Sequence, residues 1–402
     1  MKRWLTVIGI GEDGLDSLPP SSLELIEGAE ILVGGARHLD KVPDYGAQRM
    51  DWGKGFFSAI EELADHKDKN VVVMASGDPL NFGAASTLRK RYAAEEMTII
   101  PAPGAFSLAA SRMGWSLPDV EQVTVHGRPL EAVNLYLAPG AKLLILSWNG
   151  ASPAALAKLL CQKGFGKSVI HVFEHMGGEL ENHVEATAED WAIEHTADLN
   201  TMALECVAGP DARYWSRVPG LPEAAFEHDG RITKREVRAA TLARLAPLPG
   251  ETLWDIGAGS GAVGIEWLRA DNAVNAVAFE SDSAKCEVIA RNAANLGVPR
   301  LQVVEGSAVT KMDEIETAPD VIFMGGGVSD RNLVDACWQR LGPGGRLIAN
   351  GVTVEAHTAM MEFQKAHGGE LTRISVARSG AVGQLTALRP LMDVLQLKAI
   401  KQ

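Results

Sequence analysis

Two glycine-rich loops with acidic residues nearby are the features of this sequence best suited to chemistry. One loop, WDIGAGSG at 254–261, carries Gly257, Gly259 and Gly261 between a strand-like run and a helical one. Glycine lets the backbone approach a ligand closely, and the N–H groups at a helix start point toward that ligand. Glu280 ends the next predicted strand, where its carboxylate can accept both ribose hydroxyls of a nucleoside. Together these residues predict a nucleoside-binding site.

Asp255 precedes this loop, and the GxGxG spacing differs from the GxGxxG of dinucleotide-binding loops. An acidic residue followed by GxGxG resembles the loop of class I methyltransferases. Their ligand, S-adenosylmethionine (SAM), carries an amino-acid group where a dinucleotide carries a pyrophosphate. The resemblance favours SAM as the ligand, while NAD and a tight turn without any ligand are the alternatives.

The other loop, GIGEDG at 9–14, matches GxGxxG formally but lacks the rest of a dinucleotide site. The second predicted strand ends in Gly34 and Gly35, where such a site requires Asp or Glu. Ligand sites in open α/β sheets gather at strand ends. Three turn-rich segments follow predicted strands, namely ASGDPLNFG at 75–83, PAPGAFS at 101–107 and HGR at 126–128. Position alone leaves open whether Asp78 is a turn former and His126 an ordinary histidine.

The composition is that of a globular α/β protein, and a length of 402 residues predicts two domains. The net charge of −13 opposes non-specific nucleic-acid binding, so we expect no nucleic-acid partner. No apolar run reaches the roughly 18 residues of a membrane span, and the segment from Met1 to Ile8 lacks a signal peptide. We therefore expect a cytoplasmic protein without a membrane partner. The four cysteines never form CxxC, which predicts neither disulfides nor a metal site.

Short β-rich runs alternate with Ala/Leu-rich helical stretches along the chain. In the first half we expect strands at 5–10, 31–33, 71–75, 98–100, 142–147, 168–173 and 202–207. In the second half we expect a helix from Thr233 and seven strands, at 252–256, 276–280, 301–305, 321–324, 346–350, 373–377 and 384–388. The last two should form an antiparallel hairpin. Gly, Pro and Asp interrupt the pattern between the halves, so the predicted domains are 1–210 and 231–402 with a linker at 211–230.

Four segments of the first half resemble the tetrapyrrole methylase family, the SAM-dependent enzymes of non-Rossmann fold in corrinoid and sirohaem synthesis. They are GIGEDG at 9–14, ASGDPLNFG at 75–83, PAPGAFSLAASRMGW at 101–115 and HGRP at 126–129. Glu12 and Asp13 replace the usual Pro-Gly pair of the first loop, a variant that resembles the carbon-5 methylating branch. The second half, at 228–239 and 254–267, resembles the class I methyltransferase fused to such a domain in decarboxylating precorrin methyltransferases.

This resemblance implies both a fold and an activity. The implied fold is α/β, with a tetrapyrrole methylase fold of two α/β subdomains followed by a Rossmann-like, seven-stranded class I methyltransferase. The implied activity is methylation of precorrin-6B, a tetrapyrrole edged with carboxylates, at carbons 5 and 15, with decarboxylation of the ring C acetate to give precorrin-8 in cobalamin biosynthesis. The N-terminal domain would methylate carbon 5, and the C-terminal domain would methylate carbon 15 and decarboxylate. Family members are oligomers, so a homo-oligomer is expected.

The resemblance further implies one SAM site per domain, two per chain. In the first domain it assigns the cofactor to Gly9, Gly11, Gly77, Asp78, Phe82 and Ser107. In the second domain it assigns the cofactor to Thr233, Asp255, Gly257, Gly259, Gly261, Glu280, Ser307 and Ala308. Many class I enzymes place Asp where Ser307 stands, so we expect backbone groups to make the adenine contact there.

A polycarboxylate substrate on an acidic protein requires local cations, because Arg and Lys hold carboxylates best. The candidates for substrate binding are Arg37, Arg128, Lys234, Arg235, Arg238 and Arg378. Thr233 and Glu236 fit a helix capping box, so a purely structural role for the neighbouring residues is an alternative. His126 and Glu355 are the candidates for proton handling, and Glu355 can equally be a solvated residue at a helix start.

Two other functions are compatible with parts of this pattern. The tetrapyrrole methylase fold also occurs in a ribose methylase that acts on ribosomal RNA, which makes RNA methylation the main alternative. The net charge of −13 and the second methyltransferase-like half argue against it. A non-catalytic SAM sensor is the third possibility, which two intact cofactor loops disfavour.

Overall fold

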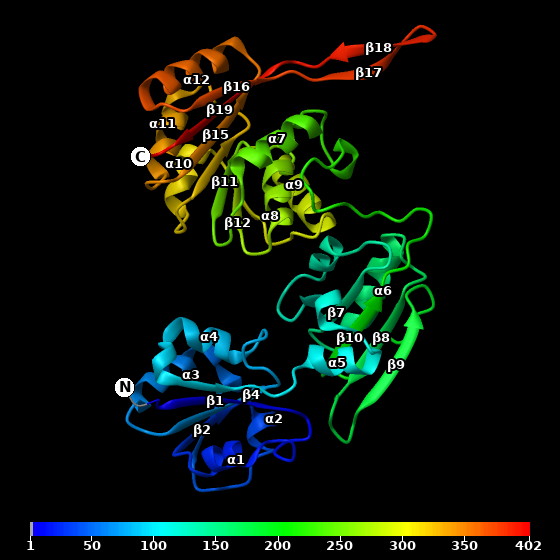
Figure 1. Cartoon of the computed structure of the whole chain (residues 1–402), viewed down its shortest axis with the longest axis vertical. Helices are drawn as coiled ribbons and strands as arrows, with labels where there is room; N and C mark the ends of the chain where they lie inside the picture. Colours follow the sequence, from blue (N-terminus) through cyan, green and yellow to red (C-terminus); the bar gives the residue numbers. More distant parts are fainter. Residues whose placement is uncertain (1–2) are drawn as a thin grey trace. The chain divides into compact units, whose positions relative to one another are not determined.

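The computed structural model describes residues 3–402, so Met1 and Lys2 lie outside the described residues. The chain forms two compact units (Figure 1). The first comprises Met1–Leu130 and Ala138–Arg213, and the second comprises Glu131–Leu137 and Tyr214–Gln402. The sequence pattern gave no sign that residues 131–137 belong with the second unit. Within residues 3–402, no helix is long and apolar enough to cross a membrane.

The first unit begins with a parallel five-stranded sheet of order β3-β2-β4-β1-β5. Its strands are β1 (Leu5–Ile10), β2 (Ile31–Gly34), β3 (Gln48–Asp51), β4 (Val71–Ser76) and β5 (Met97–Ile100). Its helices are α1 (Pro20–Glu27), α2 (Ala36–Leu39), α3 (Phe56–Glu62) and α4 (Ala84–Arg91). Alternate residues of β1 face opposite cores, because Val7 packs with α3 and α4 and Ile8 with α1 and α2. Both faces are therefore covered, as parallel sheets require.

A second, mixed sheet of order β6-β7-β10-β8-β9 completes the first unit. Its strands are β6 (Glu121–Thr124), β7 (Lys142–Leu146), β8 (Val169–Glu174), β9 (Asn182–Thr187) and β10 (Asn200–Glu205). Its helices are α5 (Ala105–Met113) and α6 (Ser152–Gln162). Only the β6–β7 pair is parallel, and β9 is an antiparallel edge strand. The expected pair of α/β subdomains is therefore confirmed, whereas strands β3, β6 and β9 were not predicted.

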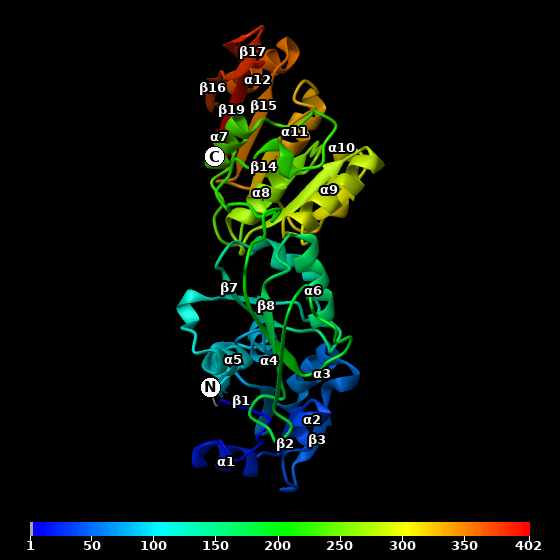
Figure 2. The same ribbon diagram turned by 90° about the vertical axis from the view of Figure 1, so that its right-hand side faces the viewer.

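The second unit is built on a seven-stranded sheet of order β13-β12-β11-β14-β15-β19-β16, in which every neighbouring pair is parallel except the two that β19 forms with β15 and β16. Figure 2 shows its strands β14, β15, β16 and β19. Its strands are β11 (Thr252–Ile256), β12 (Asn275–Glu280), β13 (Gln302–Glu305), β14 (Val321–Met324), β15 (Arg346–Gly351), β16 (Glu370–Ile374) and β19 (Val394–Ile400). Its helices are α7 (Arg235–Leu245), α8 (Ala262–Ala270), α9 (Ser283–Asn295), α10 (Ala308–Lys311), α11 (Arg331–Arg340) and α12 (Val354–His367).

Helices cover both faces of this sheet as well. Leu253 of β11 packs with α7, α8 and α9, whereas the next residue, Trp254, packs with α11 and α12. The arrangement is the expected Rossmann-like fold. Short 3₁₀ helices complete the chain, namely η1 (Trp52–Lys54), η2 (Leu63–His66), η3 (Ala94–Glu96), η4 (Leu117–Asp119), η5 (Leu130–Leu135), η6 (Glu223–Ala225) and η7 (Met312–Glu314).

The last strands of the sheet differ from the prediction. Residues 384–388, expected as the seventh strand, belong to β18 (Leu385–Pro390), which pairs only with β17 (Ala377–Val382) in a separate ribbon. Figure 1 shows this ribbon extending away from the sheet of its own unit. The seventh sheet strand is β19, which inserts between β15 and β16. The prediction took the apolar residues of β18 for a buried strand. It was wrong because Leu385 and Leu388 are 77% and 72% exposed.

Candidate active sites

Three loops meet at the carboxyl edge of the first parallel sheet, where β1, β4 and β5 end. The N–H of Gly77 donates to the carbonyl of Ile10 at 3.0 Å, and the N–H of Ala102 donates to the carbonyl of Gly77 at 3.2 Å. A Cβ at Gly9 would lie 1.9 Å from the Gly77 oxygen, so only glycine fits there. Gly9 thus allows the loops to cross, which is a packing requirement in addition to any ligand contact.

A cavity of about 910 Å³ opens beside these loops and is bounded by residues of both sheets of the first unit. Such a volume is in the range of cofactor pockets. Of the predicted site residues, those that line it are Gly11, Arg37, Gly77, Asp78, Phe82, His126 and Arg128. Gly9 and Ser107 are not among the lining residues, and Ser107 lies exposed on α5. Aromatic side chains contribute much of the wall, including Trp52, Phe56, Phe106, Trp148 and Phe173.

Phe82 and Arg128 form one wall of this cavity. Phe82 has a φ of 55°, a left-handed conformation that costs a non-glycine residue energy. Its ring contacts Phe106 edge-on, with centroids 6.0 Å apart, and the Arg128 guanidinium carbon lies 5.6 Å from its centroid. Asp78 shapes the adjoining turn, because its Oδ1 accepts the N–H of Leu80 at 2.9 Å. That bond uses one of several lone pairs, so Asp78 can act as turn former and as ligand acceptor.

Glu12 is the centre of a charged cluster in the same cavity that sequence reasoning missed. Its carboxylate lies 2.8 Å from Arg37 Nη1, 3.5 Å from Lys41 Nζ and 3.4 Å from His175 Nδ1. Burial raises the pKa of Glu12, but Arg37, Lys41 and His175 outweigh it, and the pKa lies below the ordinary value. A signal existed in the sequence, because Glu12 is one of the two residues that depart from the general family loop.

His38 lies beside this cluster and is held neutral. Its Nε2 is 2.9 Å from Ser76 Oγ and 3.3 Å from Arg37 Nη2. Burial lowers the pKa of His38 to about 4, and the positive charge of Arg37 contributes to the decrease. At neutral pH this histidine therefore adds hydrogen-bonding capacity without adding charge. The two arginines of the cavity differ in their partners. Arg37 forms an ion pair with Glu12, whereas Arg128 has no carboxylate within ion-pair distance among the described residues.

The glycine loop of the second unit has a different geometry. Gly257, Gly259 and Gly261 have φ of 68°, 62° and 75°, so all three are left-handed. The N–H of Gly259 donates to Glu280 Oε2 at 2.9 Å. Glu280 Oε1 accepts the N–H groups of Ser281 and Asp282 at 2.9 and 3.1 Å. Because a carboxylate has about four lone-pair positions, Glu280 can hold the loop and still accept ligand hydroxyls.

Asp255 lies beneath this loop, where it is 1% exposed. Its Oδ2 accepts the N–H of Gly264 in α8 at 2.9 Å. Burial raises the pKa of Asp255 to about 7; the Gly264 N–H opposes the rise, and the charge of Glu280 adds to it. Asp255 thus positions α8 against β11. Its burial supports this structural role more than the direct cofactor contact expected from the sequence.

The start of α7 corrects one local prediction. Its N-cap is Lys234, no side chain caps it, and Thr233 and Glu236 form no capping box. Glu236 instead pairs with Arg378, whose Nη2 lies 2.5 Å from its Oε2. Lys234 Nζ donates to the Gly230 carbonyl at 3.3 Å, and Arg235 is exposed. Both cations therefore stay at the surface of the second unit, near the segment that precedes α7.

Arg238 does not support the substrate-binding role predicted for it, because its side chain is wholly buried. Its Nε donates to Glu266 Oε1 at 2.6 Å, and its two terminal nitrogens donate to the carbonyls of Thr233 and Leu221. Phe226 covers the guanidinium, whose central carbon lies 4.9 Å from the ring centroid. Every nitrogen is thus committed within the fold, so Arg238 ties the segment before α7 to α8.

The remaining predicted residues of the second unit are spread over several elements. Arg378, on β17, lies 2.7 Å from Glu223 and 2.5 Å from Glu236, so a substrate carboxylate would have to compete with both. Glu355 is exposed in the first turn of α12, directly after β15. Ser307 is the backbone N-cap of α10 and is exposed, and Ala308 follows it half-buried.

Each half of the chain matches a known protein family. Residues 4–192 match the model of the Tetrapyrrole (Corrin/Porphyrin) Methylases, and residues 224–401 match that of the Precorrin methyltransferase domain. Over 394 residues the chain is 43% identical to a precorrin-6Y C(5,15)-methyltransferase [decarboxylating] of Sinorhizobium sp, covering 98% of this chain and 95% of the relative. The chain belongs to this family of decarboxylating precorrin methyltransferases. It is therefore a methyltransferase of two α/β domains, as the sequence motifs predicted.

Two further relatives each correspond to part of the chain. A cobalt-precorrin-7 C(5)-methyltransferase of Salmonella typhimurium is 31% identical over 44% of this chain and 87% of its own. A probable cobalt-precorrin-6B C(15)-methyltransferase (decarboxylating) of Pyrobaculum aerophilum is 30% identical over 45% of this chain and 95% of its own. These matches give no support to the alternative of RNA methylation.

Proposed function

We propose that this chain converts precorrin-6B to precorrin-8 in cobalamin biosynthesis by methylating carbons 5 and 15 and decarboxylating the ring C acetate. The observation that carries the proposal is the likeness, over nearly the whole chain, to a relative named for both methylations and the decarboxylation. The order of the two matched domain models along the chain adds to it.

We further propose that the two reactions are divided between the domains. Carbon 5 would be methylated in the first unit, and carbon 15 methylation with decarboxylation would occur in the second. Two observations support this division. Separate relatives carry the C(5) and the C(15) decarboxylating activities in their names, and each of them corresponds to less than half of this chain.

One SAM per domain, two per chain, is the cofactor content that we propose. In the first unit the 910 Å³ cavity beside Gly11, Gly77 and Asp78 fits such a ligand. In the second unit, Glu280 and the left-handed loop from Gly257 to Gly261 provide hydroxyl acceptors and close backbone approach. SAM bound there supplies a methyl group on a sulfonium, ready for transfer to a nucleophilic carbon.

The protein's contribution to methyl transfer in the first unit would be positioning and exclusion of water. The meso carbons of the reduced macrocycle are enamine-like nucleophiles, so alignment can supply most of the acceleration. Arg128 offers an uncommitted guanidinium to a substrate carboxylate, and Arg37 offers one that is shared with Glu12. His126 is exposed in the same cavity and is our candidate for accepting the proton released from the methylated carbon.

In the second unit, Lys234 and Arg235 are the cations that we assign to the substrate, because Arg238 is buried. Glu355 follows β15 at the carboxyl edge of the sheet, where open α/β sheets bind ligands, and is our candidate for proton handling. Decarboxylation leaves an electron pair that must be delocalised. The conjugated macrocycle can accept that pair, so the proposal requires no cofactor beyond SAM.

We also propose that the protein is a homo-oligomer. A two-stranded ribbon is marginally stable alone, and the β17–β18 ribbon exposes Leu385, Leu388 and, just beyond it, Met392. A second copy of the chain would cover these side chains. Replacing both leucines with Asp should lower the mass measured by light scattering to that of the monomer, with retained circular dichroism as the control.

The cofactor proposal is tested by the number of SAM molecules bound at equilibrium, measured by dialysis with methyl-labelled SAM. We expect two per chain in the wild type. Gly104→Arg, in a cavity-lining residue with ordinary backbone angles, and Gly259→Arg, in the second loop, should each leave one. One molecule per wild-type chain, or a variant that still binds two, would refute the two-site assignment.

A further inference from the structure

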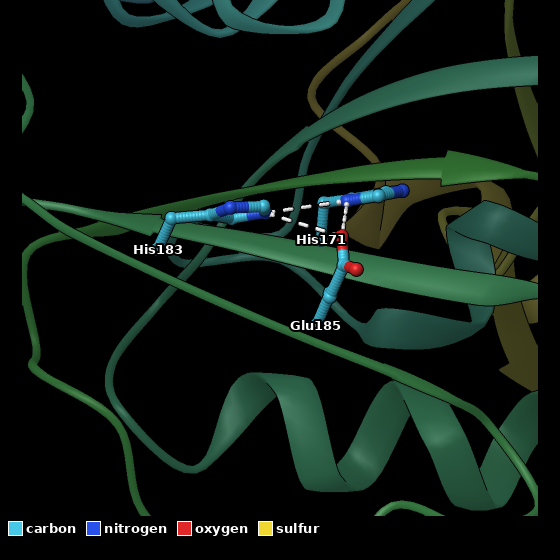
Figure 3. Close-up of side chains that lie close together, drawn as sticks. All are labelled: His171, His183 and Glu185. Carbon is cyan, nitrogen blue, oxygen red and sulfur yellow. Dashed lines mark hydrogen bonds and ion pairs between the residues drawn. The ribbon is translucent and has the colours of Figure 1, made fainter.

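A compact group of three potential metal ligands lies on the second sheet of the first unit, among the groups that the reaction does not use. His171 belongs to β8, and His183 and Glu185 belong to the edge strand β9 (Figure 3). Their ligand atoms all lie within 4.8 Å of one another, and within residues 3–402 this is the group of His, Cys, Asp and Glu that meets this criterion. The cysteine pattern predicts no metal site, and His183 and Glu185 lie on a strand that the sequence pattern does not predict.

The strand register explains why these side chains converge. In the antiparallel pair of β8 and β9, His171 lies opposite Glu185 and Phe173 lies opposite His183. Residues two apart on a strand share a face of the sheet, so all four side chains project from the same face. Phe173 is buried and its ring stacks on that of His183 at 4.6 Å, which fixes the imidazole in place. The arrangement is therefore built by the backbone pairing and does not depend on a flexible loop.

The three distances match those between ligands of one metal ion. His171 Nδ1 lies 2.8 Å from Glu185 Oε2 and 3.2 Å from His183 Nε2, and His183 Nε2 lies 3.8 Å from the same oxygen. A triangle of these sides has its centre about 1.9 Å from each corner, close to the about 2.0–2.2 Å of Zn–N and Zn–O bonds. The three ligand atoms are therefore spaced closely enough to surround one such ion.

Figure 3 shows the two imidazole rings nearly parallel, with a nitrogen of each facing the other and the Glu185 carboxylate oxygen beside the His171 nitrogen. Lone pairs that face one another at such distances repel unless a proton or a cation lies between them. Two imidazoles and one carboxylate are the donor set of open zinc sites such as His₂Glu, in which the remaining positions hold water. His171 has a side chain that is 20% exposed, and those of His183 and Glu185 are 43% and 57% exposed, so an ion can enter from solvent.

We propose that His171, His183 and Glu185 bind a divalent transition metal ion of the zinc type, which fastens edge strand β9 to β8. The donor set disfavours Mg²⁺ and Ca²⁺, since these ions take oxygen ligands. The site is separate from the proposed SAM loops, and it borders the first-unit cavity only through Phe173, which lines that cavity. The test of this metal site is therefore independent of the test of the proposed methyl transfer.

The test is calorimetric titration of the full-length, untagged protein with ZnCl₂ at pH 7.5, with MgCl₂ as the second probe. We expect one Zn²⁺ per chain and no Mg²⁺ at the same concentrations. His183→Ala removes a direct ligand and should weaken Zn²⁺ binding at least about tenfold. Even the loss of a residue that only hydrogen-bonds to a metal ligand lowers metal affinity about 10–100-fold. His195→Ala removes an exposed histidine of the same unit and should bind Zn²⁺ like the wild type.

A second variant keeps the proposal falsifiable if His183→Ala fails to fold. Glu185→Gln preserves the size of a half-exposed side chain while removing the anionic ligand, and it should also weaken Zn²⁺ binding without changing the circular dichroism. Binding should raise the melting temperature of the wild type but not that of either variant. A wild type that binds no Zn²⁺, or folded variants that bind it equally well, would overturn the proposal.

Discussion

The two glycine loops look alike in sequence but need glycine for different physical reasons. At Gly9 the backbone is strand-like, and the restriction comes from the neighbouring loop, whose Gly77 oxygen would lie 1.9 Å from a Cβ. At Gly259 the nearest heavy atom to a Cβ would be 4.0 Å away, and the restriction comes from a φ of 62°. A GxG pattern therefore marks a crossing of loops in the first unit and a left-handed turn in the second. Of Gly9 and Gly259, only Gly259 has open space where a Cβ would lie.

The charged residues near the two loops differ in the same way. Glu12 and Arg37 form an ion pair that faces the first cavity, and it remains available to ligands. Arg238 and Glu266 form a buried pair, whose side chains are 0% and 2% exposed, that ties the segment before α7 to α8. The first site thus carries its charges in the cavity wall, whereas the second relies on a buried scaffold.

Breaking each ion pair gives the largest expected contrast. Arg238→Ala leaves Glu266 buried without its partner, so the second unit should lose about 3–5 kcal/mol of unfolding free energy. Arg37→Ala removes a pair whose arginine is 41% exposed and should cost the first unit under about 1 kcal/mol. Urea unfolding followed by circular dichroism measures both. Equal losses would show that the two pairs do not differ as their burial indicates.

The next largest effect is expected from Asp255, which should make the stability of the second unit depend on pH. The pKa of Asp255 is about 7 in the folded protein, and about 3.9 is usual for an unfolded chain. The folded state therefore holds the proton more tightly, so the contribution of Asp255 to stability is greatest at low pH and declines as pH rises toward 7, by up to about 4 kcal/mol.

Asp255→Asn should flatten this decline between pH 5 and pH 8, as measured by the urea midpoint of the second unit. Asp320→Asn is the matched control, because Asp320 also accepts a backbone N–H of β11, that of Thr252 at 2.8 Å. It should keep the wild-type slope. An unchanged slope in Asp255→Asn would show that the buried carboxyl does not govern the decline.

Alanine at the two glycines tests the loop comparison itself. In Gly9→Ala the new methyl meets backbone atoms of two neighbouring loops, so about 3 kcal/mol should be lost. In Gly259→Ala the methyl has room and only the left-handed backbone is penalised, by about 1–2 kcal/mol. Differential scanning calorimetry can follow both variants. A milder effect at Gly9 than at Gly259 would contradict the distinction drawn between the loops.

The smallest effect is expected at Arg378. Its ion pairs with Glu223 and Glu236 are partly exposed, so Arg378→Ala should cost under about 1 kcal/mol and less at high salt. Arg373→Ala, whose side chain is 73% exposed, serves as the control. If Arg378 also binds the substrate, its variant should raise KM for the precorrin while the control does not. A loss of more than about 2 kcal/mol would mean that the pairs are structural.

Much of the fold could be predicted because strand ends and loop letters are local signals. The strands that carry Gly9, Asp255 and Glu280 were placed correctly, and the family motifs followed from short segments. Edge strands were harder, since β9 has a mixed, half-exposed pattern and β18 is apolar yet exposed. The order of the last strands was mispredicted because β19, and not β18, lies between β15 and β16. No local sequence pattern indicates which strand takes that place.

Residue roles were less predictable, because they depend on partners far away in sequence. The sequence predicts that Arg238 is a surface cation near the start of a helix. It can be buried because it pairs with Glu266, which is 28 residues further along the chain. Glu12 and His175 are 163 residues apart and meet only when the two sheets of the first unit come together. Gly11 and Asp78 belong to motifs and line the first cavity, whereas His38 and His175 line it too but belong to no motif.

The most direct test of two separate sites is product mass after incubation with precorrin-6B and methyl-labelled SAM. The wild type should add two methyl groups and lose one carbon dioxide. Gly259→Arg should add one methyl and lose no carbon dioxide, whereas Gly104→Arg should block the carbon-5 methylation alone. A wild type that leaves the macrocycle unchanged, or a Gly259→Arg variant that still decarboxylates, would contradict this account.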